Sequence, residues 1–315
     1  MTSAALRIGS RGSKLALRQA EMLRERLVAA HPELAAPGAI ESVVIRTTGD
    51  KVLDRPLAEI GGKGLFIKEL EEALGDRRID LAVHSLKDVP AFLPPGFALA
   101  AHLPREDARD ALIARNGAAS LTALPHGASV GTSSPRRQAQ LLNLRPDLSI
   151  VPLRGNVDTR LAKIADGAAD ATILALAGLK RIGRESEASA VLSATEMLPA
   201  ATQGIIAIEI RADDARVRSL LAPVNHQPTA ICASAERALL ETLNGDCRTP
   251  VAALATLDGN RIALAAMLLS PDGKVCHRAE RSTTTSRARE LGREIGATLI
   301  EKAGPGFAGI GAGPG

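Results

Sequence analysis

Aromatic side chains are almost absent from this sequence, which has no Trp, no Tyr and only 4 Phe among 315 residues. Proteins that bind single-stranded nucleic acids stack the bases on aromatic rings, so this composition argues against that function. The net charge of +4, from 39 basic and 35 acidic residues, is too small to indicate a polyanionic partner by itself. We therefore expect no nucleic-acid partner.

Cysteine, histidine and long apolar stretches are also scarce. The 3 cysteines are widely separated and form no CxxC pair, as is typical of reduced thiols in the cytoplasm. The 6 histidines show no HxxxH or Cys/His spacing, so we expect no metal site. No apolar run approaches the roughly 18 residues of a membrane span, and the start MTSAALRIGS lacks the pattern of an export signal. These absences predict a cytoplasmic protein without a membrane partner.

The stretch IDLAVHSLKDVP, residues 79–90, has the pattern of a buried strand that ends in polar residues. Its almost continuous apolar start is typical of a parallel strand covered on both faces. His84, Ser85, Lys87 and Asp88 follow. Ligands of open α/β sheets bind beyond the carboxyl ends of the strands, so these side chains are candidates for a site. The alternative is a solvated turn in which Lys87 and Asp88 neutralise each other.

The first strand-to-helix junction of the chain also carries a basic residue. A short strand at residues 6–9 leads through the turn SRGS into a helix predicted for residues 14–30, with Ser13 as its N-cap. Arg11 and Ser13 therefore lie beside a helix N-terminus, where free N–H groups and the helix dipole favour an anion.

A glycine-rich segment, IGGKGLF, separates the strand and exit loop predicted at residues 41–50 from a helix predicted at 66–74. Its glycines allow close backbone approach to a ligand, and Lys63 stands among them. A mobile surface loop is the alternative interpretation. Gly75 is the predicted C-cap of the helix.

The segment SVGTSSPRRQAQLL places two cations where a helix disfavours them. Ser134 is the predicted N-cap and Pro135 suits the first helical position. Arg136 and Arg137 then occupy the first turn, where positive charge opposes the helix dipole. An acidic ligand at the helix start would explain the pair, and a merely solvated pair is the alternative.

The same pattern recurs twice further along the chain. In SIVPLRGNVDTRLAKIA, Arg154 lies in the turn and Arg160 early in the helix. ADATILALAGLKRIG is predicted to be a strand followed by a loop with Lys180 and Arg181. With the preceding pair, five arginines gather at strand-to-helix junctions.

The order of elements predicts an α/β fold of two similar lobes. LEEALGDRRIDLAVHSLKDV and RLAKIADGAADATILALAGL both combine a helix, a glycine, a buried strand and a polar exit. Ligand groups on facing loops of such lobes would form a cleft. Residues 198–210 are the predicted crossing segment, with Gly204 as hinge and residues 205–210 as a strand that returns to the first lobe.

A small α+β domain is predicted from about Pro228, with a helix at 229–243 and a hairpin of strands at 251–256 and 262–269. The glycine-rich tail is predicted to be disordered. Cys232 and Cys276 are expected to be packing residues. Cys247 follows the turn residues NGD, where a thiol could be accessible or carry a covalent group.

Together these motifs resemble one known family. GSRGSKLAL, GGKGLF, HSLKDVP, GTSSPRRQAQL, LRGNVDTRL, LALAGLKR and NGDC occur in the order and spacing of the porphobilinogen deaminases, also called hydroxymethylbilane synthases. The resemblance covers nearly the whole chain except the tail. It implies an α/β fold of two periplasmic-binding-protein-like lobes with a cleft between them, plus a small C-terminal α+β domain. The expected boundaries are 1–104 with 205–227, 105–204, and 228–315.

The resemblance also implies a function. The family's transferases condense four porphobilinogen molecules head to tail, with loss of ammonia, to give the linear tetrapyrrole hydroxymethylbilane. A dipyrromethane cofactor, attached by a thioether to a cysteine that matches Cys247, is the primer. We expect a monomer.

The family's motifs assign roles to residues of this chain. Asp88 matches the catalytic aspartate, whose carboxylate can hydrogen-bond pyrrole N–H groups and stabilise a cation. Arginines suit the acetate and propionate side chains of the family's cofactor and growing pyrrole chain, because the planar guanidinium group pairs with a carboxylate through two hydrogen bonds. The expected cofactor-binding residues are Cys247, Lys87, Ser13, Thr132, Ser134, Arg136, Arg137, Arg154 and Arg160. The expected substrate-binding residues are Arg11, Arg154, Arg160, Arg181 and Lys63.

The sequence departs from the family pattern at three places. Glu59 stands where relatives usually have Lys, TQG at residues 202–204 replaces the usual GQG, and Pro135 replaces a usual Leu. The main alternative function is a non-catalytic binding protein of the same shape that holds an acidic metabolite. It would need neither Asp88 at the cleft nor a modified Cys247.

Overall fold

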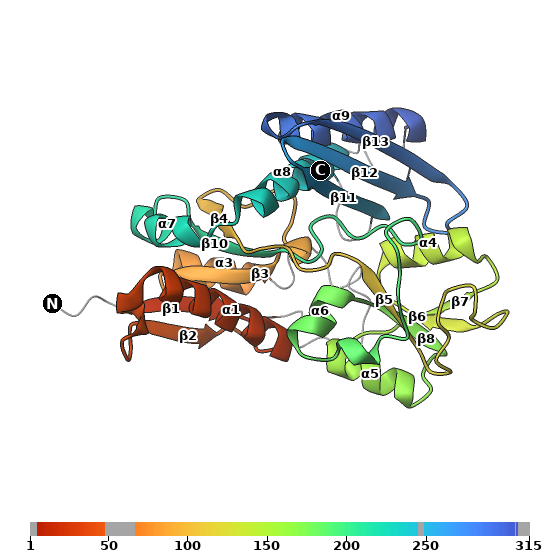
Figure 1. Cartoon of the computed structure of the whole chain (residues 1–315), viewed down its shortest axis with the longest axis horizontal. Helices are drawn as coiled ribbons and strands as arrows, with labels where there is room; N and C mark the ends of the chain where they lie inside the picture. The colour runs from red at the N-terminus through yellow and green to blue at the C-terminus, as the bar shows by residue number, and fades with distance from the viewer. Residues whose placement is uncertain (1–4, 48–66, 245–248, 306, 308–315) are drawn as a thin grey trace. The chain divides into compact units, whose positions relative to one another are not determined.

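The computed structural model describes residues 5–47, 67–244, 249–305 and 307 (Figure 1). The chain divides into two compact units, of which the first contains Met1–Arg105 and Ile205–Ala230 and the second Glu106–Gly204 and Ile231–Gly315. Within the described part of the chain, no helix has the length and apolar character that a membrane crossing requires.

The first unit is built on a five-stranded sheet of order β2-β1-β3-β10-β4. Its strands are β1 (Leu6–Ser10), β2 (Ile40–Val44), β3 (Leu81–Ser85), β4 (Phe97–His102) and β10 (Ile206–Arg211). β1 is parallel to both β2 and β3, whereas β10 is antiparallel to β3 and β4. The prediction that residues 205–210 return to the first lobe as a strand is therefore confirmed.

Helices cover both faces of this sheet, whose strands β3 and β10 are buried on both sides. These helices are α1 (Lys14–Ala30), α3 (Lys68–Gly75) and α7 (Ala215–Leu221), and the 3-10 segments are η1 (Pro32–Ala35), η2 (Leu86–Asp88) and η4 (Ala222–Val224). Leu23 and Leu27 of α1 pack with Leu81 and Val83 of β3 in one core cluster. Leu70 and Leu74 of α3 pack with Ala82 on the opposite face.

The second unit contains a sheet of the same design, with order β7-β6-β8-β5-β9. Its strands are β5 (Asp110–Ala114), β6 (Ser129–Gly131), β7 (Ser149–Val151), β8 (Ala171–Ala175) and β9 (Ala190–Val191). Its helices are α4 (Pro135–Leu144), α5 (Val157–Ala165), α6 (Leu176–Arg181) and the 3-10 segment η3 (Glu185–Glu187). β6 is parallel to β7 and β8, and β5 is antiparallel to β8. The two predicted α/β lobes are thus confirmed. Both sheets have the same pairing pattern, in which three parallel strands are followed by an antiparallel strand, β10 or β5, and then by an edge strand.

The C-terminal part of the second unit is an antiparallel sheet of β11 (Val251–Asp258), β12 (Arg261–Leu269) and β13 (Cys276–Thr284). The helices α8 (Gln227–Leu243) and α9 (Ala288–Ala303) enclose a core with it, and η5 (Thr285–Arg287) precedes α9. The small α+β domain is therefore confirmed, with a third strand and a second long helix beyond the predicted hairpin. The predicted domain boundaries and the cleft stay predictions.

Two local predictions were wrong. Gly75 is the last residue of α3 rather than its C-cap, which is Asp76, and the left-handed backbone falls on Arg77 with φ of 56°. Lys180 and Arg181 form the last turn of α6 rather than a loop. Positive charge is favourable at a helix C-terminus, and a six-residue helix is too short to show a helical period in the sequence.

Candidate active site

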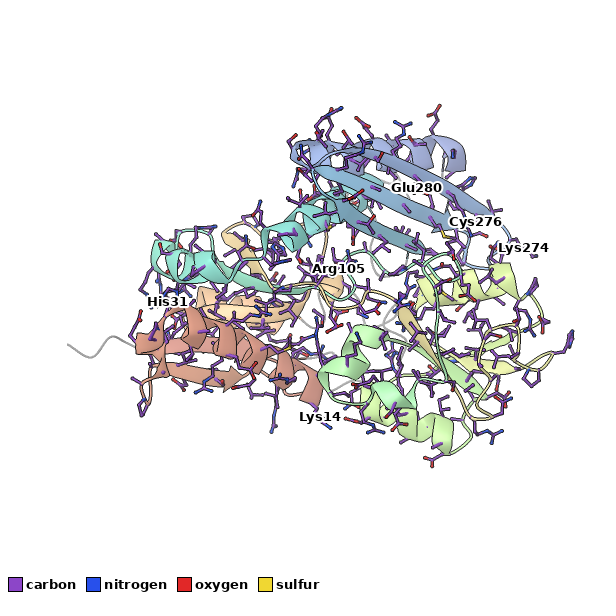
Figure 2. The ribbon with its side chains drawn as sticks, in the orientation of Figure 1. Lys14, His31, Arg105, Lys274, Cys276 and Glu280 are labelled. Atoms are coloured by element: carbon purple, nitrogen blue, oxygen red, sulfur yellow. The ribbon has the colours of Figure 1, made fainter. Side chains whose placement is uncertain are left out.

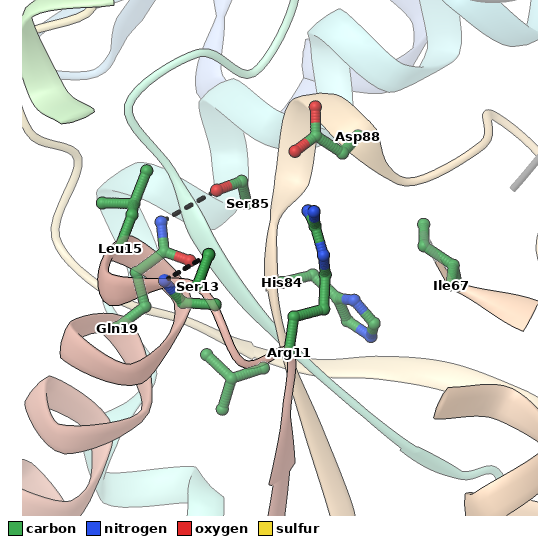
Figure 3. A pocket seen from close by; sticks show the side chains of 10 residues that line it. Arg11, Ser13, Leu15, Gln19, Ile67, His84, Ser85 and Asp88 are labelled. Atoms are coloured by element: carbon green, nitrogen blue, oxygen red, sulfur yellow. Dashed lines mark hydrogen bonds between the residues drawn. The ribbon is translucent and has the colours of Figure 1, made fainter. Parts of the chain in front are cut away.

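A pocket lies at the carboxyl ends of β1 and β3 in the first unit (Figure 3). These two strands are parallel neighbours, so the residues that follow each of them meet at one edge of the sheet. The pocket is lined by Arg11, Ser13, Leu15, Ala16, Gln19, Ile67, Val83, His84, Ser85 and Asp88. Arg11, Ser13 and Asp88, which the sequence singled out from separate segments, are thus brought together.

The N-terminus of α1 forms one wall of the pocket. The Ser13 hydroxyl accepts a hydrogen bond from the Ala16 N–H at 3.3 Å and caps the helix as predicted. Gln19, only 2% exposed, donates from Nε2 to the Ser85 hydroxyl at 2.8 Å, which joins α1 to the end of β3 (Figure 3). Gln19 belongs to none of the motifs that the sequence shows. The only sign of it in the sequence is that a polar residue falls on the apolar face of a predicted helix.

Asp88 enters the pocket from η2, the single 3-10 turn that follows β3. It is half-buried, as is Lys87 beside it. Figure 3 shows the Asp88 carboxylate and the Arg11 side chain directed into the same space. A carboxylate and a guanidinium in one pocket can bind a ligand that carries both N–H donors and acidic groups.

His84, which lines the pocket, belongs to a buried acid–imidazole pair. His84 Nε2 is 2.9 Å from Glu209 Oε2 of β10, with side chains 4% and 0% exposed. The atoms are close enough for an ion pair, but their geometry does not satisfy a hydrogen bond. Burial, and then the charge of Glu209, raise the pKa of Glu71 on α3 to about 7. Glu209 was not predicted as a site residue, and its only sign in the sequence is that a single acid interrupts an apolar strand.

The second unit holds Arg136 and Arg137 at the start of α4. Ser134 caps this helix by accepting the Arg137 N–H at 3.4 Å, and Pro135 is its first residue, as predicted. Both guanidinium groups pair with the buried Asp110 of β5, at Nη2–Oδ distances of 2.7 Å and 2.8 Å. Burial alone would raise the pKa of Asp110, but the two arginine charges outweigh it and hold this pKa well below its usual value. Asp110 therefore balances part of the positive charge for which the sequence predicted an acidic ligand.

Three arginines of the second unit have a buried N–H group that meets no acceptor among the described residues. These groups are Nε of Arg136, Nε of Arg137 and Nε of Arg181. Burial lowers the pKa of Arg181 to about 10, although the charge of Glu106 opposes this. Buried polar groups are rarely left without partners, and a cationic donor calls for an anionic acceptor. These residues therefore fit an acidic cofactor.

The other predicted residues of the second unit lie at the same sheet edge. Thr132 follows β6, and its hydroxyl accepts the Ser134 N–H at 3.1 Å. Arg154 follows β7. Arg160 lies in the first turns of α5, where its Nε donates to the Gly155 carbonyl at 2.9 Å. β6, β7 and β8 are connected by parallel pairing, so the side chains beyond their carboxyl ends face one region.

Two predicted site residues, Lys63 and Cys247, lie outside the described residues, as do Glu59 and most of the tail.

Cys232 is 7% exposed within the core around α8, which confirms its packing role. Cys276 is partly buried at the start of β13 and packs beside a second apolar cluster (Figure 2).

The fold and these side chains define a class: an α/β protein with basic, hydroxyl and carboxylate groups at the carboxyl edges of two similar sheets. Residues 6–219 match the family model described as porphobilinogen deaminase, dipyromethane cofactor binding domain, and residues 230–301 match the porphobilinogen deaminase C-terminal domain. The chain therefore belongs to the porphobilinogen deaminase family. It is an enzyme of tetrapyrrole biosynthesis, and its family's cofactor is dipyrromethane.

Curated relatives agree with the family models. The chloroplastic porphobilinogen deaminase of Oryza sativa is 50% identical over 306 residues, which cover 96% of this chain and 85% of that protein. The porphobilinogen deaminase of Paracoccus denitrificans is 51% identical over 298 residues, which cover 95% and 94% of the two chains. Among solved structures, the Bordetella pertussis BvgS VFT2 domain is similar with a TM-score of 0.42 and 13% identity, over 73% of this chain and 92% of that one.

Proposed function

We propose that this chain condenses four porphobilinogen molecules head to tail, with loss of ammonia, to give hydroxymethylbilane. The observation that carries the proposal is the pocket at the ends of β1 and β3, where Asp88 and Arg11 line one space in a chain of this family. Asp88 is the catalytic residue. Its carboxylate accepts the pyrrole N–H and stabilises the positive charge that develops on the substrate as the amine leaves.

The remaining predicted residues bind the acidic groups of substrate and cofactor. When bound, the dipyrromethane supplies the pyrrole ring to which the first substrate is joined. Cys247 is the proposed thioether attachment. The cofactor is held by Ser13, Lys87, Thr132, Ser134, Arg136, Arg137, Arg154 and Arg160, and the substrate by Arg11, Lys63, Arg154, Arg160 and Arg181. The support is the place of the described arginines, whose guanidinium donors suit carboxylates. Arg136, Arg137 and Arg160 lie near helix starts, Arg11 and Arg154 follow strands, and Arg181 ends α6.

The organisation of the protein is also a proposal. We infer a cytoplasmic monomer with lobes at 1–104 plus 205–227 and at 105–204, and a small domain at 228–315. The scarcity of cysteine supports a reducing compartment. The pattern of parallel and antiparallel strand pairing that the two sheets share supports the division into lobes.

The test of Asp88 is the Asp88→Asn variant, which keeps the size of the side chain but removes its charge. We expect turnover to fall by at least about 100-fold, the usual scale for a lost acid–base or electrostatic group. Asp76→Asn is the matched control, because Asp76 is an exposed residue of the same unit, and its turnover should be normal. Near-normal turnover by a folded Asp88→Asn protein would remove Asp88 from the mechanism.

The attachment is tested by intact mass and peptide mapping. The wild-type protein should carry an added mass of two linked pyrrole units on the Cys247 peptide, Cys247→Ala should lack it, and the control Cys276→Ala should keep it. An adduct of unchanged mass on Cys247→Ala would move the attachment elsewhere. A wild-type chain that stays unmodified after incubation with porphobilinogen would favour the binding-protein function.

A further inference from the structure

The cluster around Asp110 has more partners than a simple ion pair. Asp110 is the first residue of β5 and is 0% exposed. Its Oδ2 accepts from Arg136 Nη2 at 2.7 Å. Its Oδ1 accepts from Arg137 Nη2 at 2.8 Å and from Gln203 Nε2 at 2.8 Å. One carboxylate thus fixes two guanidinium groups and the amide of a third residue.

The charges of the cluster do not cancel. Arg136 and Arg137 carry two positive charges, Asp110 carries one negative charge, and each arginine is 5% exposed. Within the described part of the chain, these two arginines make no ion pair other than those with Asp110. One positive charge is therefore left over in a buried place, at a helix N-terminus that itself disfavours cations.

The unused donors point the same way. Nε of Arg136 and Nε of Arg137 are buried and meet no acceptor in the described residues. A purely structural network would be expected to satisfy these groups, because a buried donor without a partner costs about 1–3 kcal/mol or more when charged. Leftover charge and leftover donors occur on the same two side chains.

We propose that Asp110 is a positioning residue that orients Arg136 and Arg137 and sets their joint charge so that the cluster binds one carboxylate of an acidic ligand. The ligand class rests on the proposed function, in which the acidic cofactor is held here. Without Asp110 the pair would carry two uncompensated charges. With a second internal acid it would have no charge left for a ligand.

Asp110 also connects this binding group to the crossing segment. Gln203 donates to both Asp110 and the Ala108 carbonyl, the latter at 2.7 Å. Arg136 Nη1 donates to the Leu198 carbonyl at 2.7 Å. The guanidinium groups are therefore held from β5, from α4 and from the segment after Leu198, which restricts the geometry in which a carboxylate can dock.

The test compares thermal unfolding of the apoprotein and the cofactor-loaded protein. The loaded form is made by incubation with porphobilinogen and verified by intact mass. Asp110→Asn should lower the midpoint of the apoprotein by on the order of 10 °C, because it leaves two buried cations without their counter-charge. The midpoint of the loaded protein should fall by less than half as much, because a ligand carboxylate then faces the arginines.

Asp147→Asn is the matched control. Asp147 pairs with Arg145 just beyond the other end of α4, at 2.7 Å and partly exposed. Its replacement should lower the midpoint of both forms equally. Equal losses for Asp110→Asn would reduce Asp110 to a structural role and overturn the inference. If the wild type gains no mass with porphobilinogen, the proposed function fails first, and the ligand assigned to this cluster fails with it.

A second variant keeps the test decisive if Asp110→Asn does not fold. Asp110→Asn combined with Arg136→Met restores the native leftover charge of one, now on Arg137 alone. We expect this double variant to fold, to show a cooperative melting transition as apoprotein, and to gain the cofactor mass. A double variant that fails to fold as Asp110→Asn does would show that charge does not govern the cluster.

Discussion

Gly204, the last residue of the crossing segment in the second unit, cannot accept a side chain without cost. Its φ is +88°, in the left-handed region, and an added Cβ would overlap the carbonyl oxygen of Glu106. Its own carbonyl accepts from Arg181 Nη2 at 2.6 Å and from the Glu106 N–H at 3.1 Å. Gly204→Ala should therefore disturb both stability and a proposed substrate arginine.

The magnitude follows from two separable costs. A left-handed backbone destabilises the folded state by about 1–2 kcal/mol when an L-residue replaces glycine. Alanine also restricts the unfolded chain, and this offsets roughly 0.4–1 kcal/mol of the loss. The overlap with Glu106 adds about 1–3 kcal/mol. Gly183 provides the matched control, because its φ is +68° but no described atom lies within 4 Å of an added Cβ. Gly183→Ala pays only the first cost.

The assay is thermal unfolding of both variants beside the wild type. We expect a loss of roughly 0.5–1 kcal/mol for Gly183→Ala and about 2–4 kcal/mol for Gly204→Ala, or about 8 °C for the latter. The KM for porphobilinogen should rise about tenfold in Gly204→Ala only, because a displaced Arg181 loses a bond worth about 1.5–3 kcal/mol. Equal losses of stability in the two variants would refute the reasoning from close packing.

Two further predictions concern Glu71 of α3 and Gln19 in the wall of the first-unit pocket. The pKa of Glu71, about 7 when folded, lies above its ordinary 4.5, so the folded chain holds a proton that the unfolded chain releases between these pH values. That stabilisation is complete below pH 4.5 and lost as the pH rises through 7. Glu71→Gln should therefore match the wild-type melting temperature near pH 5 and exceed it at pH 8. A constant difference across pH would contradict this. Gln19→Leu removes the donor to Ser85 and should lower turnover about tenfold while stability changes by roughly 1 kcal/mol. Unchanged kinetics would make the bond dispensable.

Local signals in the sequence were sufficient for much of the fold. The helix predicted at 14–30 is observed at Lys14–Ala30, because its apolar spacing and the Ser13 cap are properties of neighbouring residues. The start of α4 at Pro135 was also predicted from neighbouring residues. By contrast, α9 was missed, since Gly292 and Gly296 inside it lower helix propensity and packing against α8 overrides that preference.

The site residues, too, were predictable where local sequence determines them and not where distant segments meet. Residues in contiguous motifs, such as Ser13 and Asp88, could be selected from the sequence and lie around one pocket. Asp110 could not, because its partners Arg136 and Arg137 follow it by 26 and 27 positions and no local pattern links them. The His84–Glu209 pair depends on the pairing of β3 with β10, two strands that are distant in the sequence.

Helix α4 contributes both to the arginine cluster around Asp110 and to the core of the C-terminal sheet within the second unit. Its first turn carries Arg136 and Arg137, whereas Ala139 packs against Ala252, Met267 and Leu269 of the C-terminal sheet. A hydrogen bond from Asn143 Nδ2 to the Gly273 carbonyl, at 2.8 Å, holds the turn between β12 and β13 against the same helix. Anyone who builds chimeras from members of this family should therefore transplant the outward side of α4 together with the C-terminal sheet. A junction that separates them would cut through a packed core rather than through a linker.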